Sequence, residues 1–424
     1  MRSGRSYIFS VVLWAALGGM MTPAWGDLAA AKGALAGRDF PTAIAQAEKS
    51  AATHPYDAAM ITARAHMELG QLDPALAAVA RAKAARPGDS ASYALEGLIL
   101  LRMGRPGRAM LSLRRALDLA QNDQQKNIAR ALIRQAKSAQ TWAVQGGIGI
   151  VPSSNLNKAT TAETITVLIP GTTAPVQAQL TGGQAAAGTG VRLFGQATRP
   201  LGPWGISFGG DITHTDDPAL RQQSLQFGVT RTLGASRWGL THQRRFVGGD
   251  SFVATTTLRF DHQVALSGQS ALRFNLGLAH QNRFDDPLRD GYITTLGARW
   301  IKLVRPTLAW DAGVQLQNTA SRSAFEASQS LTLDIGARGA LTGTGWIWDG
   351  RLRAGTGHWD NVAPFEPLVR QDRYVGLSLS AQNNNVSFYG LTPTYGLSAQ
   401  RRKSNLARHD IRSVDLFIGL ANAF

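Results

Sequence analysis

Arginines on one face of an alternating pattern are the side chains of this chain best suited to contact a charged substrate. Through the second half, every other residue is apolar, and five arginines fall on the opposite, polar face: Arg259, Arg273, Arg299, Arg338 and Arg353. Aspartates share that face, among them Asp261, Asp334 and Asp349. Two interpretations are open. The arginines line a basic channel that attracts an anionic cargo, or they pair with the carboxylates in a hydrated wall network.

Two serine–asparagine pairs, each at the end of an alternating segment, are the second candidate feature. Asparagine caps turns and tolerates strained backbone through its short amide side chain. The pairs therefore either fix the bend between strand and loop, or hold a loop across a channel as a gate. The residues concerned are Ser154, Asn155 and Asn157 in the first segment, and Ser404 and Asn405 in the second.

Other reactive chemistry is absent from the sequence pattern. The chain has no cysteine, which excludes a disulfide framework, a thiol nucleophile, a thiolate metal site and an acylated N-terminal cysteine. No two-histidine metal spacing, Gly-rich phosphate loop or Gly-x-Ser-x-Gly nucleophile motif is found. We therefore expect no catalytic residues, no metal and no cofactor, and we do not expect an enzyme.

The charge balance indicates an anionic partner. Lys and Arg number 44 against 28 Asp and Glu, a net charge of +16. Nucleic acid, lipopolysaccharide and an acidic substrate all fit such an excess. The arginines are spread through the alternating segments and form no basic tail, so we do not expect nucleic-acid binding.

The elements that carry these residues are predicted to be membrane-spanning strands. From Trp142 the pattern has a period of two, as where Leu331, Leu333 and Ile335 alternate with polar or glycine residues. An apolar face opposite a polar one fits lipid outside and water inside. A soluble sandwich alternates too, but the N-terminus, the strand number and the C-terminus favour a membrane barrel, which must close because lipid leaves no partner for a free sheet edge.

Fourteen alternating segments are found, an even number as in single-chain bacterial barrels. They lie near 142–150, 186–198, 204–214, 221–232, 236–246, 252–265, 271–282, 291–303, 307–318, 327–340, 346–359, 371–382, 386–400 and 411–424. The short turns fall on the side of the preceding helical region, which we predict to be the periplasm. The longest loop, from about 151 to 184, could fold over or into the lumen.

The two chain ends carry targeting patterns. Phe424 closes the last segment, and Leu420 and Ile418 lie on its face, as in the C-terminal signal that the barrel-assembly machinery reads. At the other end, a basic start and an apolar run precede Ala24 and Gly26, a small-x-small cleavage site. An uncleaved anchor is the alternative, but the apolar run is short for a membrane span.

Residues 27 to about 138 are Ala-rich and predicted to be helical. Gly37, Gly70 and Gly104 recur at spacings of 33 and 34 residues, the period of tetratricopeptide repeats. Such repeats stack into a concave surface that commonly holds a peptide or protein; a generic helical bundle without a ligand is the alternative. The fold class we predict is an all-α tetratricopeptide-like repeat domain followed by a 14-stranded antiparallel transmembrane β-barrel, with boundaries 1–26 (signal peptide), 27–140 (periplasmic helical domain) and 141–424 (outer-membrane barrel).

The chain resembles the surface lipoprotein assembly modifier (Slam) family. The resemblance is carried by the Ser-Asn-x-Asn-x-Ala-Thr stretch at 154–160, by the Ser404–Asn405 pair in the last hairpin, and by the layout of helices before a barrel. It implies an outer-membrane factor of a Gram-negative bacterium that delivers lipoproteins, or related secreted proteins, to the cell surface. The expected partners are a client captured by the periplasmic domain, outer-membrane lipid and the barrel-assembly machinery. The alternative function is a porin or exopolysaccharide-export channel.

Overall fold

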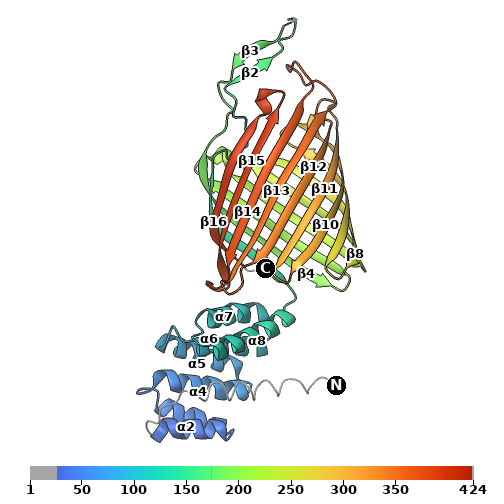
Figure 1. Cartoon of the computed structure of the whole chain (residues 1–424). Helices are drawn as coiled ribbons and strands as arrows, with labels where there is room; N and C mark the ends of the chain where they lie inside the picture. The colour runs from blue at the N-terminus through green and yellow to red at the C-terminus, as the bar shows by residue number, and fades with distance from the viewer. Residues whose placement is uncertain (1–25, 173, 423–424) are drawn as a thin grey trace. The chain divides into compact units, whose positions relative to one another are not determined.

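The computed structural model describes residues 26–172 and 174–422 (Figure 1). Two compact units divide the chain. The first holds the helices α2 (Gly26–Ala36), α3 (Phe40–Lys49), α4 (Pro55–Glu68), α5 (Leu72–Ala85), α6 (Ser90–Arg102), α7 (Pro106–Asp118) and α8 (Asp123–Ala139). The predicted helical region is confirmed. The tetratricopeptide character stays a prediction.

Local signals in the sequence define these helices. Asp39, Asp89 and Asn122 each accept a backbone N–H of the first helical turn, which satisfies a group that the helix itself leaves free. Gly70 and Gly104 lie between the helices of successive pairs with φ of +74° and +69°, a conformation that a side chain disfavours. Buried alanines and a few larger side chains then fill the spaces between neighbouring helices.

The second unit is a closed antiparallel barrel of 14 strands. Its strands are β1 (Ala143–Ser153), β4 (Gly188–Leu201), β5 (Trp204–Thr215), β6 (Gln222–Leu233), β7 (Ser236–Val247), β8 (Asp250–Ser267), β9 (Ser270–Arg283), β10 (Gly291–Arg305), β11 (Leu308–Ser321), β12 (Ser328–Ala340), β13 (Trp346–Trp359), β14 (Gln371–Asn383), β15 (Leu391–Ser404) and β16 (Ile411–Asn422). Each strand pairs with its sequence neighbour, and β1 closes the barrel by pairing with both β4 and β16.

The two faces of the wall differ as the alternation predicts. On β12, Leu331, Leu333 and Ile335 are exposed, whereas Asp334 between them has a side chain that is only 7% exposed. The same contrast holds on the other strands, whose exposed large apolar residues occupy alternate positions. The apolar face therefore points outward, and the polar, glycine-rich face lines the lumen.

The two ends of the barrel carry different connections. The links 202–203, 234–235, 268–269, 306–307, 341–345 and 384–390 lie at one end, which we call the short-turn end. The links 154–187, 216–221, 284–290, 322–327, 360–370 and 405–410 lie at the other, which we call the long-loop end, together with the short turn between β7 and β8. Most links follow the loop lengths expected from the sequence, but the link 384–390 is as long as several loops of the long-loop end.

Two details differ from the sequence prediction. The first loop contains an unpredicted hairpin of β2 (Thr164–Val167) and β3 (Val176–Gln179), drawn beyond the long-loop end in Figure 1 rather than inside the lumen. The thirteenth strand, predicted from 386, begins at Leu391. Tyr389 and Gly390 before it have φ of +52° and +77°, and this left-handed backbone cannot continue a strand.

Within the described residues, no helix is long and apolar enough to cross a membrane.

Candidate functional site

The first serine–asparagine pair ties the start of the first loop to the last strand. Asn155 is fully buried. Its side-chain nitrogen donates to the carbonyls of Ala159 (2.9 Å) and Arg412 (3.1 Å), and its side-chain oxygen accepts the Ala159 amide (3.0 Å). Ser154 donates its backbone amide to the Val414 carbonyl (2.9 Å) and accepts the Val414 amide on its hydroxyl (2.8 Å). Strand β1 thus delivers a loop whose first residues are bonded to β16.

Asn157 joins the two ends of the same loop. Its side-chain nitrogen donates to the Gln184 carbonyl at 2.7 Å, and its side-chain oxygen accepts the Ala186 amide at 3.0 Å. The Leu156 amide donates to the Ala186 carbonyl at 2.7 Å. The two chain segments that lead into and out of the hairpin β2–β3 are therefore joined by the side-chain amide of Asn157. We call Ser154, Asn155 and Asn157 the β1 clasp.

The second pair holds the last hairpin against the loop 360–370. The Asn405 side-chain oxygen accepts the Gln371 amide, and its nitrogen donates to the Val369 carbonyl, both at 2.7 Å. The Ser404 amide donates to the Asp410 carboxylate at 2.6 Å, and the Ser404 hydroxyl donates to the Gln371 carbonyl at 3.3 Å. We call Ser404 and Asn405 the β15 clasp. Both candidate pairs thus lie at the long-loop end, and each bonds a loop to a neighbouring strand or loop.

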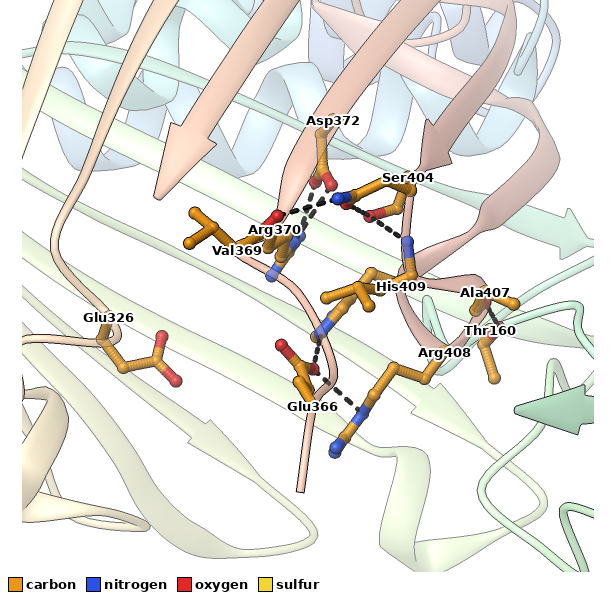
Figure 2. A network of polar contacts seen from close by, with 12 residues as sticks. Thr160, Glu326, Glu366, Val369, Arg370, Asp372, Ser404, Ala407, Arg408 and His409 are labelled. Atoms are coloured by element: carbon orange, nitrogen blue, oxygen red, sulfur yellow. Dashed lines mark hydrogen bonds and ion pairs between the residues drawn. The ribbon is translucent and has the colours of Figure 1, made fainter. Parts of the chain in front are cut away.

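A charged network beside the β15 clasp was missed by the sequence analysis (Figure 2). The buried Glu366 carboxylate lies 2.6 Å from His409 Nε2 and 3.6 Å from Arg408 Nε. Asp372, also buried, pairs with Arg370 at 2.5 Å. Glu366 and His409 are 43 positions apart, so no local motif marks them. The signal available in the sequence was the concentration of charged residues in two loops, 360–370 before β14 and 405–410 after β15.

The surroundings of His409 lower its pKa below the ordinary value of 6.5. Burial is the largest cause, because it penalises the charged imidazolium, and the nearby Arg370 cation adds to it. The bond to Glu366 acts in the opposite direction without cancelling the shift. The neutral imidazole is therefore the form that the folded loop favours.

The first loop joins this network from the other side. The Thr160 hydroxyl donates to the Ala407 carbonyl at 2.9 Å, as Figure 2 shows, and the Thr161 amide donates to the Asp410 carbonyl at 3.1 Å. The Leu168 amide donates to the Phe365 carbonyl at 2.9 Å. Loops 154–187, 360–370 and 405–410 therefore form one hydrogen-bonded rim, although they are distant in sequence.

Two arginines and two aspartates form an ion cluster on the lumenal wall. Asp311, Asp334, Arg299 and Arg351 lie on the inward face of four neighbouring strands, β10 to β13. Arg299 pairs with Asp334 at 2.7 Å and with Asp311; Arg351 pairs with Asp311 at 2.8 Å and with Asp334. Each carboxylate thus bridges two guanidinium groups. Of these four, Asp311 and Arg351 were not among the candidates, because sequence alone cannot show which inward residues meet across strands.

The other candidate arginines share the inward face but have different partners. Arg259 pairs with Asp261 at 2.9 Å, and Arg273 donates to Gln263 at 3.0 Å. Arg338 lies opposite Asp349 in the register, but no ion pair joins them. Arg353 faces a lumenal hollow of about 280 Å³ whose lining includes Gln400 and Arg402. The wall therefore contains both paired arginines and arginines open to the lumen, so neither interpretation of the sequence accounts for all five.

The terminal candidates are described in part. Ala24 and Phe424 lie outside the described residues, and Gly26 is the first residue of α2, so cleavage and the assembly signal stay predictions. Ile418 and Leu420 lie opposite Ile150 and Ile148 of β1, at the seam where the barrel closes. Among residues 26–172 and 174–422, no group of three metal-ligating side chains converges.

The fold and its outward apolar face define an outer-membrane β-barrel preceded by a helical unit. The family described as "Surface lipoprotein assembly modifier" matches residues 226–424, from within β6 to the end of the chain. This match confirms the family resemblance stated from the sequence. It includes the β15 clasp, whereas the β1 clasp lies before it.

Several solved structures are similar to the barrel half. A BenF-like porin from Pseudomonas fluorescens Pf-5 has 10% identity and a TM-score of 0.37, covering 67% of this chain and 99% of that one. OccK1 (OpdK) from Pseudomonas aeruginosa has 11% identity and a TM-score of 0.36, covering 66% and 98%. A bacterial polysaccharide outer membrane secretin has 10% identity and a TM-score of 0.35, covering 66% and 98%. No curated protein matches the chain.

Proposed function

We propose that this chain delivers client lipoproteins, or related secreted proteins, across the outer membrane to the cell surface. The observation that carries the proposal is the match of the surface lipoprotein assembly modifier family over eleven consecutive strands of the closed barrel, β6 to β16. A closed barrel has no free edge and can remain in lipid while its lumen stays hydrated. The function requires no catalytic group, so we propose a non-enzymatic role.

The division of labour we propose follows the two units. Residues 1–26 direct export and are removed. Residues 27–140 form the periplasmic domain that captures the client, because stacked helix pairs present a surface suited to a polypeptide. Residues 141–424 form the barrel, with its short-turn end toward the periplasm and its long-loop end toward the outside. Folding of the client outside supplies the energy, since the periplasm provides no nucleotide.

The rim suggests how passage is controlled. Asn155 is buried and makes three side-chain hydrogen bonds, one to β16 and two within the first loop, while Asn405 links the end of β15 to loop 360–370. Side-chain hydrogen bonds of this kind contribute about 1 kcal/mol each. They can hold a loop closed at rest and yield when a client passes. We propose that the two clasps set the resting position of the long loops.

Surface display tests the proposal. The chain is co-expressed with candidate clients encoded beside it, in a host that lacks the family, and intact cells are probed with protease and antibody. We expect the client to be exposed on the cell surface only with the full chain. Deletion of residues 27–138 should abolish this exposure, although the barrel still shows the heat-modifiable migration in gel electrophoresis that marks a folded barrel. Asn155→Ala is expected to retain the barrel but alter display several-fold. Its control is Asn361→Ala, which removes an exposed side-chain bond of a long loop outside both clasps.

Two results would contradict this assignment. Clients that stay inside with a folded, full-length chain would remove the delivery function. If uptake of small solutes or export of an anionic polymer rises instead, the chain is a porin or exopolysaccharide channel. The arginines open to the lumen, such as Arg353, are the observation that favours this second function.

A further inference from the structure

Four cations gather on the outward face of β14, β15 and β16 near the long-loop end. On β14, Arg373 occupies the same alternation as the exposed Val375 and Leu377. On β15, Arg401 and Lys403 continue the outward series that includes Tyr395, and on β16 Arg412 continues the series of Val414 and Leu416. These cations therefore point toward the lipid side of the wall and away from the lumen.

The register places these cations directly opposite one another. Arg373 is the cross-strand partner of Lys403, and Arg401 is the partner of Arg412. Like charges at directly opposed positions destabilise a sheet unless an anion lies between them. Within residues 26–172 and 174–422, none of the four has an ion-pair partner. The patch is thus a site of uncompensated positive charge.

The carboxylates nearest in sequence and register are engaged elsewhere. Asp372 pairs with Arg370 and Arg402 on the inward side. Asp415 pairs with Lys158 at 2.5 Å. Asp410 accepts the Ser404 amide. The protein itself therefore does not supply the anion that this arrangement requires.

The surface around the patch is amphiphilic. One step along the strands toward the short-turn end, the outward positions become apolar: Leu377, Leu379, Val414 and Leu416 are exposed. Two residues along a strand span about 7 Å, so the charged and apolar surfaces adjoin each other. A hollow of about 880 Å³ on the outer wall begins at Arg373 and Lys403, and its lining reaches Leu296, Leu316 and Leu331 on the outward face of β10 to β12.

We propose that this patch is a binding site for a phosphorylated lipid of the outer leaflet. Phosphate oxygens would bridge the opposed cations, because guanidinium groups bind phosphate in a bidentate manner and lysine adds a point charge. The acyl chains would cover the exposed leucines below, and the hollow would take part of the headgroup or a chain. A soluble acidic peptide would satisfy the charges but leave the apolar surface beneath them uncovered.

The site goes beyond the proposed function and does not depend on any client. It rests on the membrane placement, since the long-loop end must lie in the leaflet that holds such lipids. A lipid anchored at β14 to β16 would lie close to the β15 clasp, because Ser404 and Asn405 line the same hollow as Arg373 and Lys403. The lipid composition of the outer leaflet would thus influence the rim. Its effect would begin at Arg401 and Arg412, whose charges the lipid phosphate neutralises.

The test is a binding titration of the purified full chain in neutral detergent with fluorescent diphosphoryl lipid A. Two double variants remove the opposed pairs, Arg373→Gln with Lys403→Gln, and Arg401→Gln with Arg412→Gln. The control double variant is Arg231→Gln with Lys302→Gln. Both of its residues are exposed and outward-facing, but they lie toward the short-turn end. All three variants lose the same charge, and each is first checked for the heat-modifiable migration of a folded barrel.

We expect each patch variant to weaken binding about tenfold or more, since each cation near an anionic lipid surface contributes substantially, and the control to change it less than twofold. A charge-preserving variant, Arg373→Lys with Arg401→Lys, should retain most of the binding. Lipid A without phosphates should bind the wild type as weakly as lipid A binds the patch variants.

Three results would overturn the proposal. Equal losses in the control and patch variants would show unspecific attraction to a basic protein. Displacement of the lipid by inorganic phosphate at millimolar concentration would identify a free-phosphate site. Binding of an acidic peptide that competes with lipid A and is lost in the patch variants would identify a polypeptide site. The titration contains no client. A negative result would therefore overturn the lipid site and leave the proposed delivery function standing, and a failed display experiment would leave the lipid site standing.

Discussion

The helical unit and the barrel place their apolar residues in opposite directions. In the helices the most buried side chains are apolar, such as Ala63, Ile99 and Leu113. In the barrel the large apolar residues are exposed, Leu333 by 54%, whereas Asn155 and Ser413 are fully buried. The hydrophobic effect acts on both, but one unit has water outside and the other lipid. Apolar side chains therefore contact other side chains in the helical unit, whereas in the barrel they face lipid.

This contrast also separates what holds each unit together. Helix packing depends on close contact between small side chains, which leaves no room for voids. The barrel wall depends on inter-strand hydrogen bonds, a lumenal ion cluster and the rim clasps. Packing defects should thus damage the helices most, and polar defects the barrel.

The largest effect expected is from Leu113→Ala in α7. Leu113 is 0% exposed, and its removal loses transfer free energy and leaves a cavity, for a total of about 4 kcal/mol. Leu333→Ala should cost only about 2 kcal/mol, because lipid fills the space and the cavity contribution is absent. Urea unfolding measures both losses of stability. Far-UV circular dichroism monitors the helices, and tryptophan fluorescence in vesicles monitors the barrel. Leu111→Ala, at an exposed position, is the control, and equal costs at 113 and 333 would contradict the comparison.

A smaller effect is expected from Asp334→Asn in the lumenal cluster. The change leaves Arg299 and Arg351, whose side chains are 31% and 17% exposed, with Asp311 as their shared carboxylate. Breaking a buried ion pair costs about 3 kcal/mol, because a charge stays uncompensated. Asp261→Asn is the matched control, since its partner Arg259 is largely exposed, and it should cost less than about 1 kcal/mol. The midpoint of barrel unfolding in vesicles decides between them, and similar shifts would show a hydrated, weakly coupled lumen.

The smallest effect is expected at the rim, as a dependence on pH. The lowered pKa of His409 means that the folded loop favours neutral imidazole. Its stabilising contribution is complete above the ordinary value of 6.5 and is lost as the pH falls through the lower folded-state pKa. Cleavage of loop 360–370 by an added protease should therefore become several-fold faster on acidification below 6.5. His409→Gln should give a rate without this dependence, and an unchanged pH response in that variant would assign the effect to another group.

The sequence predicted the barrel more completely than its rim. Alternation located all fourteen strands, since lipid on one face and water on the other impose a period of two along every strand. The hairpin β2–β3 was missed because its two four-residue strands are too short for a periodic signal. The start of β15 was misplaced because the alternation continues into residues whose backbone turns at Tyr389 and Gly390.

The candidate residues were identified by type, and their partners were not. Asn155 and Asn405 stand out in the sequence because asparagine after serine ends a strand, but their acceptors on Arg412 and Val369 belong to distant segments. Likewise, the period of two places Arg299 and Asp334 on the inward face. It does not say that Arg351, rather than Arg353, completes the cluster.

Sequence alone determined the two regions, the faces of each strand and the resemblance to a family, since these depend on local periodicity and on short motifs. Tertiary structure decided which charges meet: the lumenal cluster, the union of three loops at the rim, and the opposed cations on the outer wall. The reason is the register of the strands. It sets which side chains lie within a few ångströms of one another, and it follows from closing the whole barrel, which no single segment encodes.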